Sequence, residues 1–599
     1  MSSHFSSGIA KYSSRKWLIP ATLFLVCYLL FVQLAKTDYQ YVFGDWKSEI
    51  YADKSGYYIY LPATFIYGYH QTGYPDSIDF KLGNGFGFVK GRVFTKYTYG
   101  VALMASPFFL ATHCYQSISG TEANGFNNAY LSFPGHASVF YLLAGLAALF
   151  VFLRRRFSLF ATVSALVMLT FGTNLYYYTF QEPLMSHVYS FALFSFLMLL
   201  TDNYLVMPDR RTLAGIALVS ALITLIRPTN IIFLTVVICL DVQSWSKVRE
   251  RLKILFSTGN MLVISGLFIL IWLPQMAYWK FMSGSFLFYT YKGEGFTNWL
   301  NPQIPGVLFA PKNGLFTYVP AFFLLLTGLV QMLLRNKANG RMIGILFIFQ
   351  LYIISSWHLF SFGCSFGQRS FVEFFSLFSV PLAVIYDQNF RPPRIYPLMI
   401  LLLISSYFIF FNLRMSASYA RCFDGKNWDW ELFREQLVRA EVFPLPGNVF
   451  YWKNDFETTN LHSTAGINIK EVNNAFSGNK VNILAGNNRF SDGFELRPGE
   501  TGTGKIYSIV TSMQLYLNKP AEGASFACSL ENQDTTLFFE TRSVDPDRKL
   551  PLKTWTLVEE SFEIPFLEPV GRLRIYLMTN KSEDMLIDDF TVSIYSEKN

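Results

Sequence analysis

Two carboxylates stand close together near the start of the chain. Glu49 and Asp53, four residues apart, occur in WKSEIYADKSGYYIYLP just after an apolar segment, and this spacing places both on one face of a helix. The aromatic run with Tyr57 and Tyr58 follows directly, so it would hold a carboxylate at the edge of a membrane. A carboxylate there is suited to general base catalysis, although two solvated loop acids would show the same spacing.

Three basic residues are candidates for binding an anion. Lys96, Arg227 and Arg369 each stand beside an apolar run, in segments that we expect on the outer side of a membrane. Cations in such places can be exceptions to the usual charge asymmetry of membrane loops. Three of them together favour an anionic ligand such as a lipid phosphate.

A metal site is the third kind of chemistry to weigh. Glu182 and His187 occur in QEPLMSH, in a loop expected on the same outer side. A single histidine is more often a hydrogen-bonded structural residue, and two ligands are too few to define a metal site. We expect both residues in the cavity around Asp53, and a divalent metal stays an open alternative. The six cysteines show no CxxC or CxxH spacing, so they indicate neither a zinc site nor a disulfide framework.

The composition places these residues in a membrane protein. Of the 599 residues, 52% are hydrophobic, 18% are aromatic and only 15% are charged, and the mean hydropathy is +0.28. A soluble protein would rarely bury so much apolar surface, so we predict a polytopic α-helical membrane protein. The net charge of +8 comes from short basic clusters between apolar runs, which set membrane topology and do not indicate a nucleic-acid partner.

The positions of the basic clusters predict how the chain crosses the membrane. A first span over 17–34 follows Arg15 and Lys16, which places the N-terminus in the cytoplasm. Arg154 to Arg156 end a later span and should also be cytoplasmic, so the short run 100–113 does not cross and is interfacial or re-entrant. Continuing in this way gives about eleven helices and an external C-terminus.

One apolar run is interrupted in a way that indicates a helical hairpin. The run 213–240 contains Arg227-Pro228, and a proline kinks or ends a helix. Basic clusters stand at both ends of the run, so the chain must enter and return as two short helices of roughly 15–20 Å each. Arg227 would then lie at the tip of the hairpin.

The last part of the chain changes to short alternating strands. Segments such as KVNILAG, KIYSIVTSMQLYL and RLRIYLM alternate apolar and polar residues between turn-forming residues, which predicts an antiparallel β-sandwich of about 150 residues. We therefore predict a membrane domain over 1–415, a connector over 416–444 and an external sandwich over 445–599.

Taken in order, several of these motifs resemble those of bacterial GT-C glycosyltransferases, the multispan enzymes that include the aminoarabinose and protein O-mannosyl transferases. Asp53 in EIYADKSGYYIYLP stands where the family has an acidic catalytic base, and Arg227-Pro228 matches a helix-breaking basic turn. Lys96 loosely matches a juxtamembrane basic element, with Tyr97-Thr98-Tyr99 where the aminoarabinose enzymes have prolines. EPLMSH, FAPKNGLFTYVP and SFGQRSF look like recurring segments of this group. The resemblance covers roughly residues 15–415.

The predicted sandwich is similar to carbohydrate-binding jelly rolls. This second resemblance rests on Asp455 to Glu457 near its start and Ile587 to Phe590 near its end. Together the two resemblances imply a catalytic membrane domain that carries an external sugar-binding module.

The first resemblance implies an enzyme that transfers a sugar from a polyprenyl-phosphate donor to a hydroxyl of a glycan, lipid or protein. Asp53, with Glu49 beside it, would serve as the base, and Arg227, Lys96 and Arg369 would bind the donor phosphate. No glycine-rich nucleotide loop is visible in the sequence, in keeping with a lipid-linked donor. The protein would lie among the lipids of a bacterial cytoplasmic membrane, with the sandwich periplasmic or external.

Two other classes of function compete with this interpretation. A transporter or flippase of a lipid-linked glycan would also need cations near the membrane, but matching helical halves are not visible in the sequence. A sugar-binding sandwich on a simple membrane anchor would need only one or two spans. The residues do not identify the donor sugar, the acceptor or the stereochemistry.

Overall fold

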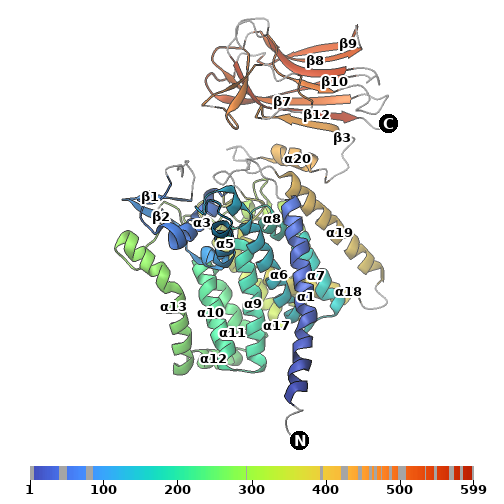
Figure 1. Cartoon of the computed structure of the whole chain (residues 1–599). Coiled ribbons are helices and arrows are strands. Elements are labelled where there is room, and N and C mark those ends of the chain that lie inside the picture. The colour runs from blue at the N-terminus through green and yellow to red at the C-terminus, as the bar shows by residue number, and fades with distance from the viewer. Residues whose placement is uncertain are drawn as a thin grey trace. The chain divides into compact units, whose positions relative to one another are not determined.

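The computed structural model describes most of the chain. The chain divides into two compact units, Met1–Gln436 and Leu437–Asn599. The first unit is mostly helical and the second is built mainly of strands (Figure 1). The described residues are 6–38, 50–75, 85–291, 293–363, 365–390, 395–419, 429–440, 442, 448–457, 462–464, 468–473, 475–484, 489–496, 507–521, 523–532, 535–545, 550–564, 572–579 and 585–596.

Helices make up most of the first unit. In chain order they are α1 (Ser6–Asp38), α3 (Ala52–Tyr58), α4 (Tyr60–Pro62), η1 (Ala63–Tyr67), α5 (Gly100–Ile118), η2 (Asn128–Leu131), α6 (Phe133–Arg154), α7 (Leu159–Phe171), α8 (Leu175–Phe180), α9 (Ser186–Val206), α10 (Arg210–Ile226), η3 (Pro228–Leu234), α11 (Thr235–Cys239), α12 (Trp245–Leu255), α13 (Thr258–Ser283), α14 (Ile304–Phe309), α15 (Leu315–Tyr318), α16 (Phe322–Leu334), α17 (Ala338–Ser355), η4 (Arg369–Phe371), α18 (Phe375–Asn389), α19 (Ile395–Ser418) and α20 (Trp430–Arg439), the last of which extends into the second unit.

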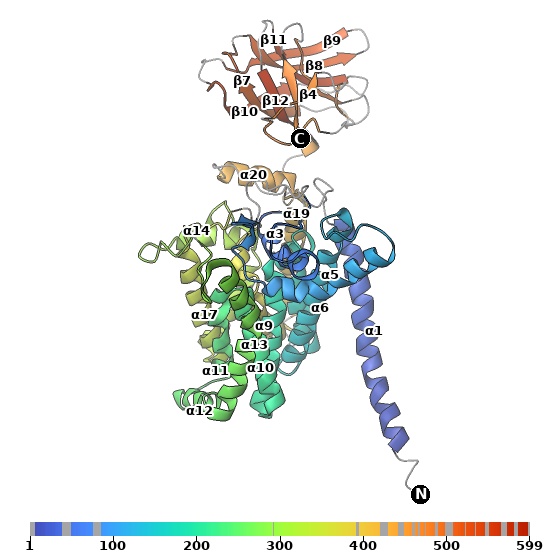
Figure 2. The same ribbon diagram turned by 60° about the vertical axis from the view of Figure 1, so that its left-hand side comes forward.

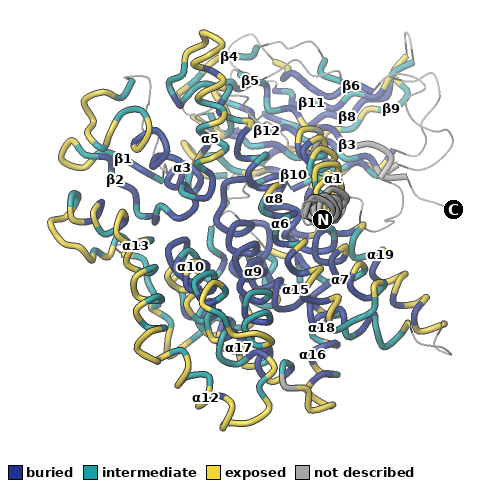
Figure 3. The backbone as a smooth tube through the Cα atoms, turned by 60° about the horizontal axis from the view of Figure 1, so that its bottom comes forward, coloured by how far each residue is buried: buried dark blue, intermediate teal, exposed yellow. Residues whose placement is uncertain are grey.

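Four described helices are long and apolar enough to cross a membrane, namely Asn128–Arg154, Ser186–Val206, Thr258–Ser283 and Ile395–Ser418. They differ in burial, because 67% of the apolar stretch of α9 is buried inside the protein but only 11% of that of α13. Figure 3 shows the same contrast, with α9 in the buried interior and α13 on the exposed periphery. An apolar helix that leaves most of its surface uncovered fits a lipid environment. The predicted helical membrane fold agrees with these helices, and the count of about eleven helices, the two hairpin arms included, stays a prediction.

The chain does bend at Arg227, as the proline motif predicted. Helix α10 ends at Ile226, and Arg227 is extended with φ −148° and ψ 112°, the region into which a following proline forces its neighbour. The first arm is longer than predicted, because Asp209 caps α10 through the amides of Arg211 and Thr212 and so starts it before the apolar run. Its 17 residues span about 25 Å. The second arm begins as the 3-10 helix η3, whose larger rise returns the chain over a similar distance with fewer residues.

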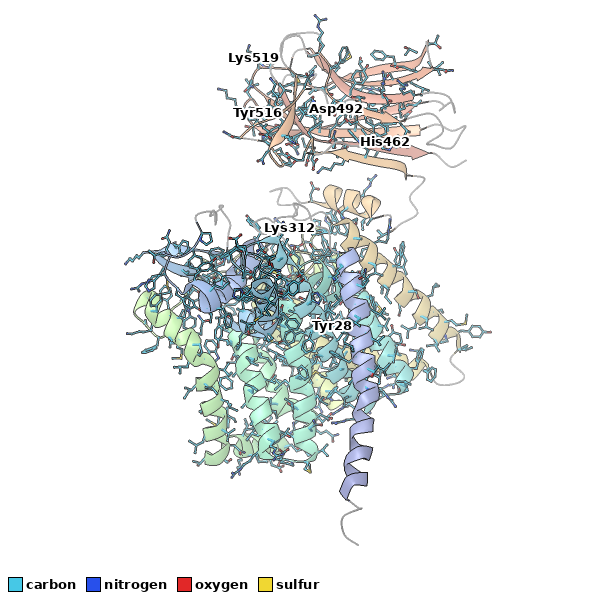
Figure 4. All side chains as sticks on the ribbon, in the orientation of Figure 1. Tyr28, Lys312, His462, Asp492, Tyr516 and Lys519 are labelled. Atoms are coloured by element: carbon cyan, nitrogen blue, oxygen red, sulfur yellow. The ribbon has the colours of Figure 1, made fainter. Side chains whose placement is uncertain are left out.

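The segment between α1 and α6 contains a β-hairpin followed by helix α5. Strands β1 (Phe86–Val89) and β2 (Arg92–Thr95) pair as an antiparallel hairpin, and Lys90 and Gly91 at its turn both have positive φ, as a tight hairpin requires. Helix α5 follows, and it continues five residues beyond the predicted run 100–113 to Ile118. In Figure 2 it runs across the direction of α9 and α10. Helix α1 contacts α6 through Tyr28 (Figure 4), whose hydroxyl lies 3.0 Å from Nδ1 of His136.

Two antiparallel sheets form the second unit, as the alternating pattern predicted. One has the order β10-β7-β12-β5-β4 with β3 beside β12, and the other has the order β6-β11-β8-β9. The strands are β3 (Asn448–Asn454), β4 (Ile469–Glu471), β5 (Lys480–Leu484), β6 (Phe494–Leu496), β7 (Tyr507–Leu517), β8 (Ala524–Asn532), β9 (Thr535–Ser543), β10 (Trp555–Ile564), β11 (Arg572–Thr579) and β12 (Met585–Ser596). Both sheets supply alternate residues to one core, such as Ile509 and Met513 from one and Phe526 and Ile575 from the other. Asp492 (Figure 4) is a buried polar exception, and its carboxylate accepts from the hydroxyl of Thr464 at 2.9 Å.

Candidate functional site

Asp53 lies in the first turn of α3, where two groups hold its carboxylate. Arg369 Nη1 is 3.0 Å from Oδ2, and the hydroxyl of Tyr97 donates to Oδ1. The preceding residue, Ala52, has φ +49°, a strained conformation for a residue other than glycine. The backbone therefore presents this carboxylate in a fixed place at some conformational cost.

The surroundings keep Asp53 ionised. Burial, the largest influence, would by itself raise the pKa of the carboxyl group, but the surrounding cations and the hydrogen bond from the Tyr97 hydroxyl together lower the pKa below its usual value, with Arg369 the largest of these. Lys96 and Arg227 lower it further, so both cations lie close enough to act on this carboxylate. At neutral pH the group is an anion that can accept a proton.

A glycine allows Tyr97 to reach Asp53. A Cβ built on Gly56 would stand 2.2 Å from the ring of Tyr97, so any other residue there would push the ring away. Tyr57 and Tyr97 pack with ring centroids 4.7 Å apart, and Tyr291 meets Tyr97 edge to face at 6.2 Å. Three tyrosine rings therefore surround the carboxylate.

Lys54, the neighbour of Asp53, ties α3 to the loop between α8 and α9. Its Nζ is 2.8 Å from Oε2 of Glu182, and the lysine side chain is almost fully buried. A buried cation needs such a partner, because its desolvation would otherwise destabilise the fold by several kcal/mol. This pair fixes the position of α3 and therefore of Asp53.

Glu373 joins Arg227, at the end of α10, to His187 of α9. Its Oε1 is 3.0 Å from Nη1 of Arg227, and its Oε2 is 3.0 Å from Nδ1 of His187. The carboxylate is completely buried, whereas the side chain of Arg227 is 22% exposed. Glu373 thus neutralises Arg227 on one side and leaves part of the guanidinium accessible.

Lys96 makes the most exposed ion pair of the site. Its Nζ is 2.6 Å from Oε1 of Glu294, and the two side chains are 31% and 34% exposed. The ammonium group also lies over the rings of Tyr97 and Tyr291, 5.6 and 5.3 Å from their centroids. The Thr290 hydroxyl donates to the carbonyl of Lys96 at 2.6 Å, so the segment with Tyr291 and Glu294 packs directly on this lysine.

The loop that carries Arg369 is set by a glycine and by α8. Gly367 has φ +65°, and a Cβ there would lie 2.9 Å from Cβ of Tyr318, so this turn needs glycine. Asn174 donates to the carbonyl of Phe366 at 2.9 Å. These contacts direct the chain into η4, which begins at Arg369.

Most of the residues that the sequence predicted for the site lie close together in the structure, but their ion-pair partners were not predicted. Asp53, Lys96, Arg227, Arg369 and Tyr57 form one cluster. Tyr58 lies apart from it in the core, where its ring packs on Phe109 and Phe133 and its hydroxyl donates to Gly125. Glu182 forms an ion pair with Lys54, and His187 lies within hydrogen-bond distance of Glu373. Glu49 lies outside the described residues.

Five residues of the cluster were missed by sequence reasoning, namely Lys54, Tyr97, Tyr291, Glu294 and Glu373. One of them carried a usable signal, since Glu373 interrupts the apolar run FVEFFSLF, and an acid inside an apolar span marks a functional site by default. Glu294 occurs in the loop motif YKGEGF, which does not indicate its partner.

The two candidate metal ligands do not converge. Among the described residues, no group of three His, Cys, Asp or Glu side chains is placed to hold a metal ion. Nδ1 of His187 faces Glu373, and Glu182 faces Lys54. Each of the two residues is therefore held by a different partner.

No family model and no curated protein sequence matches the chain. Solved structures with some likeness include the archaeal oligosaccharyltransferase AglB from Archaeoglobus fulgidus, 11% identical, with a TM-score of 0.39 over 71% of this chain and 60% of AglB. The arabinosyltransferase EmbB from Mycobacterium smegmatis is 9% identical, with a TM-score of 0.34 over 91% of this chain and 63% of EmbB. The CBM22-1 xylan-binding domain from Paenibacillus barcinonensis Xyn10C is 14% identical, with a TM-score of 0.19 over 26% of this chain and 100% of that domain. Sequence identities and TM-scores as low as these assign no activity. A function must therefore be inferred from the geometry of the site.

We expect Glu373→Gln to destabilise the protein strongly. The substitution keeps the size of the side chain but leaves the charge of Arg227 uncompensated, and breaking a buried pair typically costs about 3–5 kcal/mol. The midpoint of thermal unfolding in detergent micelles measures this. Glu294→Gln is the matched control, because its pair is about a third exposed and should contribute about 1 kcal/mol or less. Equal midpoints for the two variants would contradict the structural role of Glu373.

Proposed function

We propose that this protein is a membrane glycosyltransferase that moves a sugar from a polyprenyl-phosphate donor to an acceptor hydroxyl on the outer face of the cytoplasmic membrane. The observation that carries the proposal is the ionised carboxylate of Asp53, oriented by Arg369 and Tyr97 within reach of the charges of Lys96 and Arg227. A base beside cations is what displacement at a phosphate-linked sugar carbon requires. The motif resemblance of residues 15–415 supports the same reaction.

In this reaction the carboxylate and the cations of the cluster have different roles. The acceptor oxygen forms a bond to the anomeric carbon, the bond from that carbon to the phosphate oxygen breaks, and the phosphate leaves with the electron pair. Asp53 takes the proton of the acceptor hydroxyl, which would otherwise be a poor nucleophile. Lys96 and Arg227 neutralise the charge that develops on the leaving phosphate.

Arg369 is better suited to orienting Asp53 than to binding the donor. Its Nη1 lies 3.0 Å from the carboxylate, and the pairing keeps the base ionised. We therefore propose Lys96 and Arg227 as the main phosphate ligands. Arg369 could contact the phosphate only if the acceptor hydroxyl replaced it as the partner of the Asp53 carboxylate.

Each cation of the cluster is already paired with a carboxylate of the protein. The pairs are Asp53–Arg369, Lys54–Glu182, Lys96–Glu294 and Arg227–Glu373. A donor phosphate must therefore share a cation with a carboxylate or replace the carboxylate. Replacement should be easiest at Lys96, since its pair is the most exposed, and exposed pairs are held by little free energy.

Asp53→Asn should lower the transfer rate by a factor of roughly 10² or more, the usual size of general base assistance. Donor binding should change little, because the amide keeps the shape of the carboxyl group. Initial rates with purified protein and a panel of polyprenyl-phosphate sugars measure both quantities. Glu49→Gln should be far milder, and the reverse ranking would move the base to Glu49.

The same assay tests the role of Arg369. Because this arginine stabilises the ionised form of Asp53, Arg369→Gln should raise the pKa of the carboxyl group and move the acidic limb of the pH–rate profile to higher pH. If the acidic limb of the pH–rate profile does not move, Arg369 does not control the ionisation of the base.

Glu294→Gln should strengthen donor binding. Removing this carboxylate frees Lys96 for the phosphate, and the loss of an exposed competitor of about 1 kcal/mol corresponds to a KM for the donor roughly fivefold lower. Lys96→Gln should act in the opposite direction. Glu122→Gln provides the control, since it removes the same charge from an exposed loop residue. A higher or unchanged KM in the Glu294 variant would show that the two anions do not compete.

For the second unit we propose glycan binding. Trp555 begins β10 and pairs across the sheet with Tyr516 of β7 (Figure 4), their ring centroids 5.5 Å apart. Phe476 lies 6.0 Å from Trp555 and is half exposed. A row of partly exposed rings offers apolar faces that can pack against sugar rings, which supports a role in holding the acceptor or product.

Residues 437–599, expressed alone, should fold and unfold in one cooperative transition, because both sheets share one core. Isothermal titration with soluble oligosaccharides should detect binding that Trp555→Ala lowers at least severalfold without a change in the unfolding midpoint. Trp452, buried in the core, gives the contrasting variant, since Trp452→Ala should unfold the unit. An insoluble product, or binding that is indifferent to Trp555, would contradict this role.

A further inference from the structure

Helix α12 differs from its neighbours in direction and in charge. It links α11 to α13 and lies across the ends of the upright helices in Figures 1 and 2. Its sequence, WSKVRERLKIL, holds four cations and one acid. A short basic helix that lies across a bundle end is the geometry of a helix at a membrane surface.

One edge of α12 combines aromatic and basic residues. Trp245, Arg249 and Lys253 follow one another at intervals of four, and Phe256 comes directly after the helix, so at 100° per residue all four fall within an arc of about 80°. Trp245 is 74% exposed and Phe256 65% exposed. Val248, about 100° around the helix from the middle of this arc, is buried and anchors the helix to the protein.

The cations of this edge are distinguished from others nearby by their lack of protein partners. Arg251 donates to the carbonyl of Ile238 at 2.8 Å and also to that of Leu240, so it caps α11. Arg156 pairs with Asp202 and Asp241. For Arg249 and Lys253, by contrast, no ion pair is formed within the described part of the chain.

The edge lies next to a surface that needs lipid. Helix α13 starts two residues after Phe256, and only 11% of its apolar stretch is buried. Leu262, Ile269 and Leu270 are each more than 60% exposed, and Figure 3 shows α12 and α13 together on the exposed periphery. The unpaired cations therefore stand where the hydrocarbon that covers α13 gives way to headgroups.

We propose that the edge formed by Trp245, Arg249, Lys253 and Phe256 binds anionic phospholipid headgroups of the adjoining leaflet. The two cations supply charge for a lipid phosphate, and the exposed rings at the two ends of the row insert at the interface, where aromatic side chains are enriched. A free phosphate would use only the cations. The rings and the neighbouring lipid-facing helix select a headgroup that belongs to a membrane.

Native mass spectrometry of the full chain, released from vesicles of phosphatidylcholine mixed with phosphatidylglycerol, tests the proposal. The wild type should retain phosphatidylglycerol in preference, and Arg249→Gln with Lys253→Gln should lower that preference about ten- to thirtyfold, at roughly a factor of five per cation. Added salt should weaken the preference of the wild type. Inorganic phosphate should not displace the lipid.

The matched control is Lys247→Gln with Arg335→Gln, which removes two exposed charges from outside this edge. It should leave the preference within about twofold of the wild type, a difference well below the contribution of one cation. If the control lowers the preference as much as the edge variant, the effect is diffuse surface charge and the proposal fails. A wild type without preference, or displacement by inorganic phosphate alone, also overturns it. Unchanged thermal unfolding of both variants excludes misfolding as the cause.

Discussion

The membrane unit depends on pairing each buried charge with an opposite one. Four ion pairs hold the candidate site, and one member of a pair, Glu373, has no exposed surface at all. Inside a protein an unpaired charge costs several kcal/mol, so each carboxylate there requires a cation and each cation requires a carboxylate. Because the partners come from separate segments of the chain, the same requirement that neutralises the site also fixes how α3, η4, the end of α10 and the connecting loops approach one another.

Small backbone features decide where these charges meet. Gly56 lets the Tyr97 ring cross α3 and reach Asp53. Pro228 forces Arg227 out of the helical conformation, so that its side chain leaves the end of α10 toward Glu373. Positive φ at Ala52 and Gly367 turns the chain immediately before Asp53 and Arg369. The geometry of the site thus follows from local sequence, while its electrostatics follow from tertiary contacts.

This division explains what the sequence could predict. Apolar periodicity and proline placement were local signals, and they gave the helical unit, the bend at Arg227 and the alternating strands of the sandwich. The partners of the charges were not predictable, because Lys96 and Glu294 are 198 residues apart and Arg227 and Glu373 are 146 apart. Asp53 was found because an acid beside an aromatic run is unusual by itself. Tyr97 was noted only as a departure from a family pattern, since its hydrogen bond to Asp53 depends on Gly56.

Exposure separates the two most buried of the four pairs from the most exposed one, and the two kinds behave differently. Lys54–Glu182 and Arg227–Glu373 each have a member with less than a tenth of its surface exposed, and separating such pairs leaves a desolvated charge behind. Lys96–Glu294 is about a third exposed on both sides, so water and counterions can compensate either partner when it is released. A site that is neutral at rest can take up the full charge of an anionic ligand most easily by such a release. The buried pairs therefore hold the site in a fixed geometry, and the exposed pair is the place where a carboxylate can be exchanged for an anionic ligand.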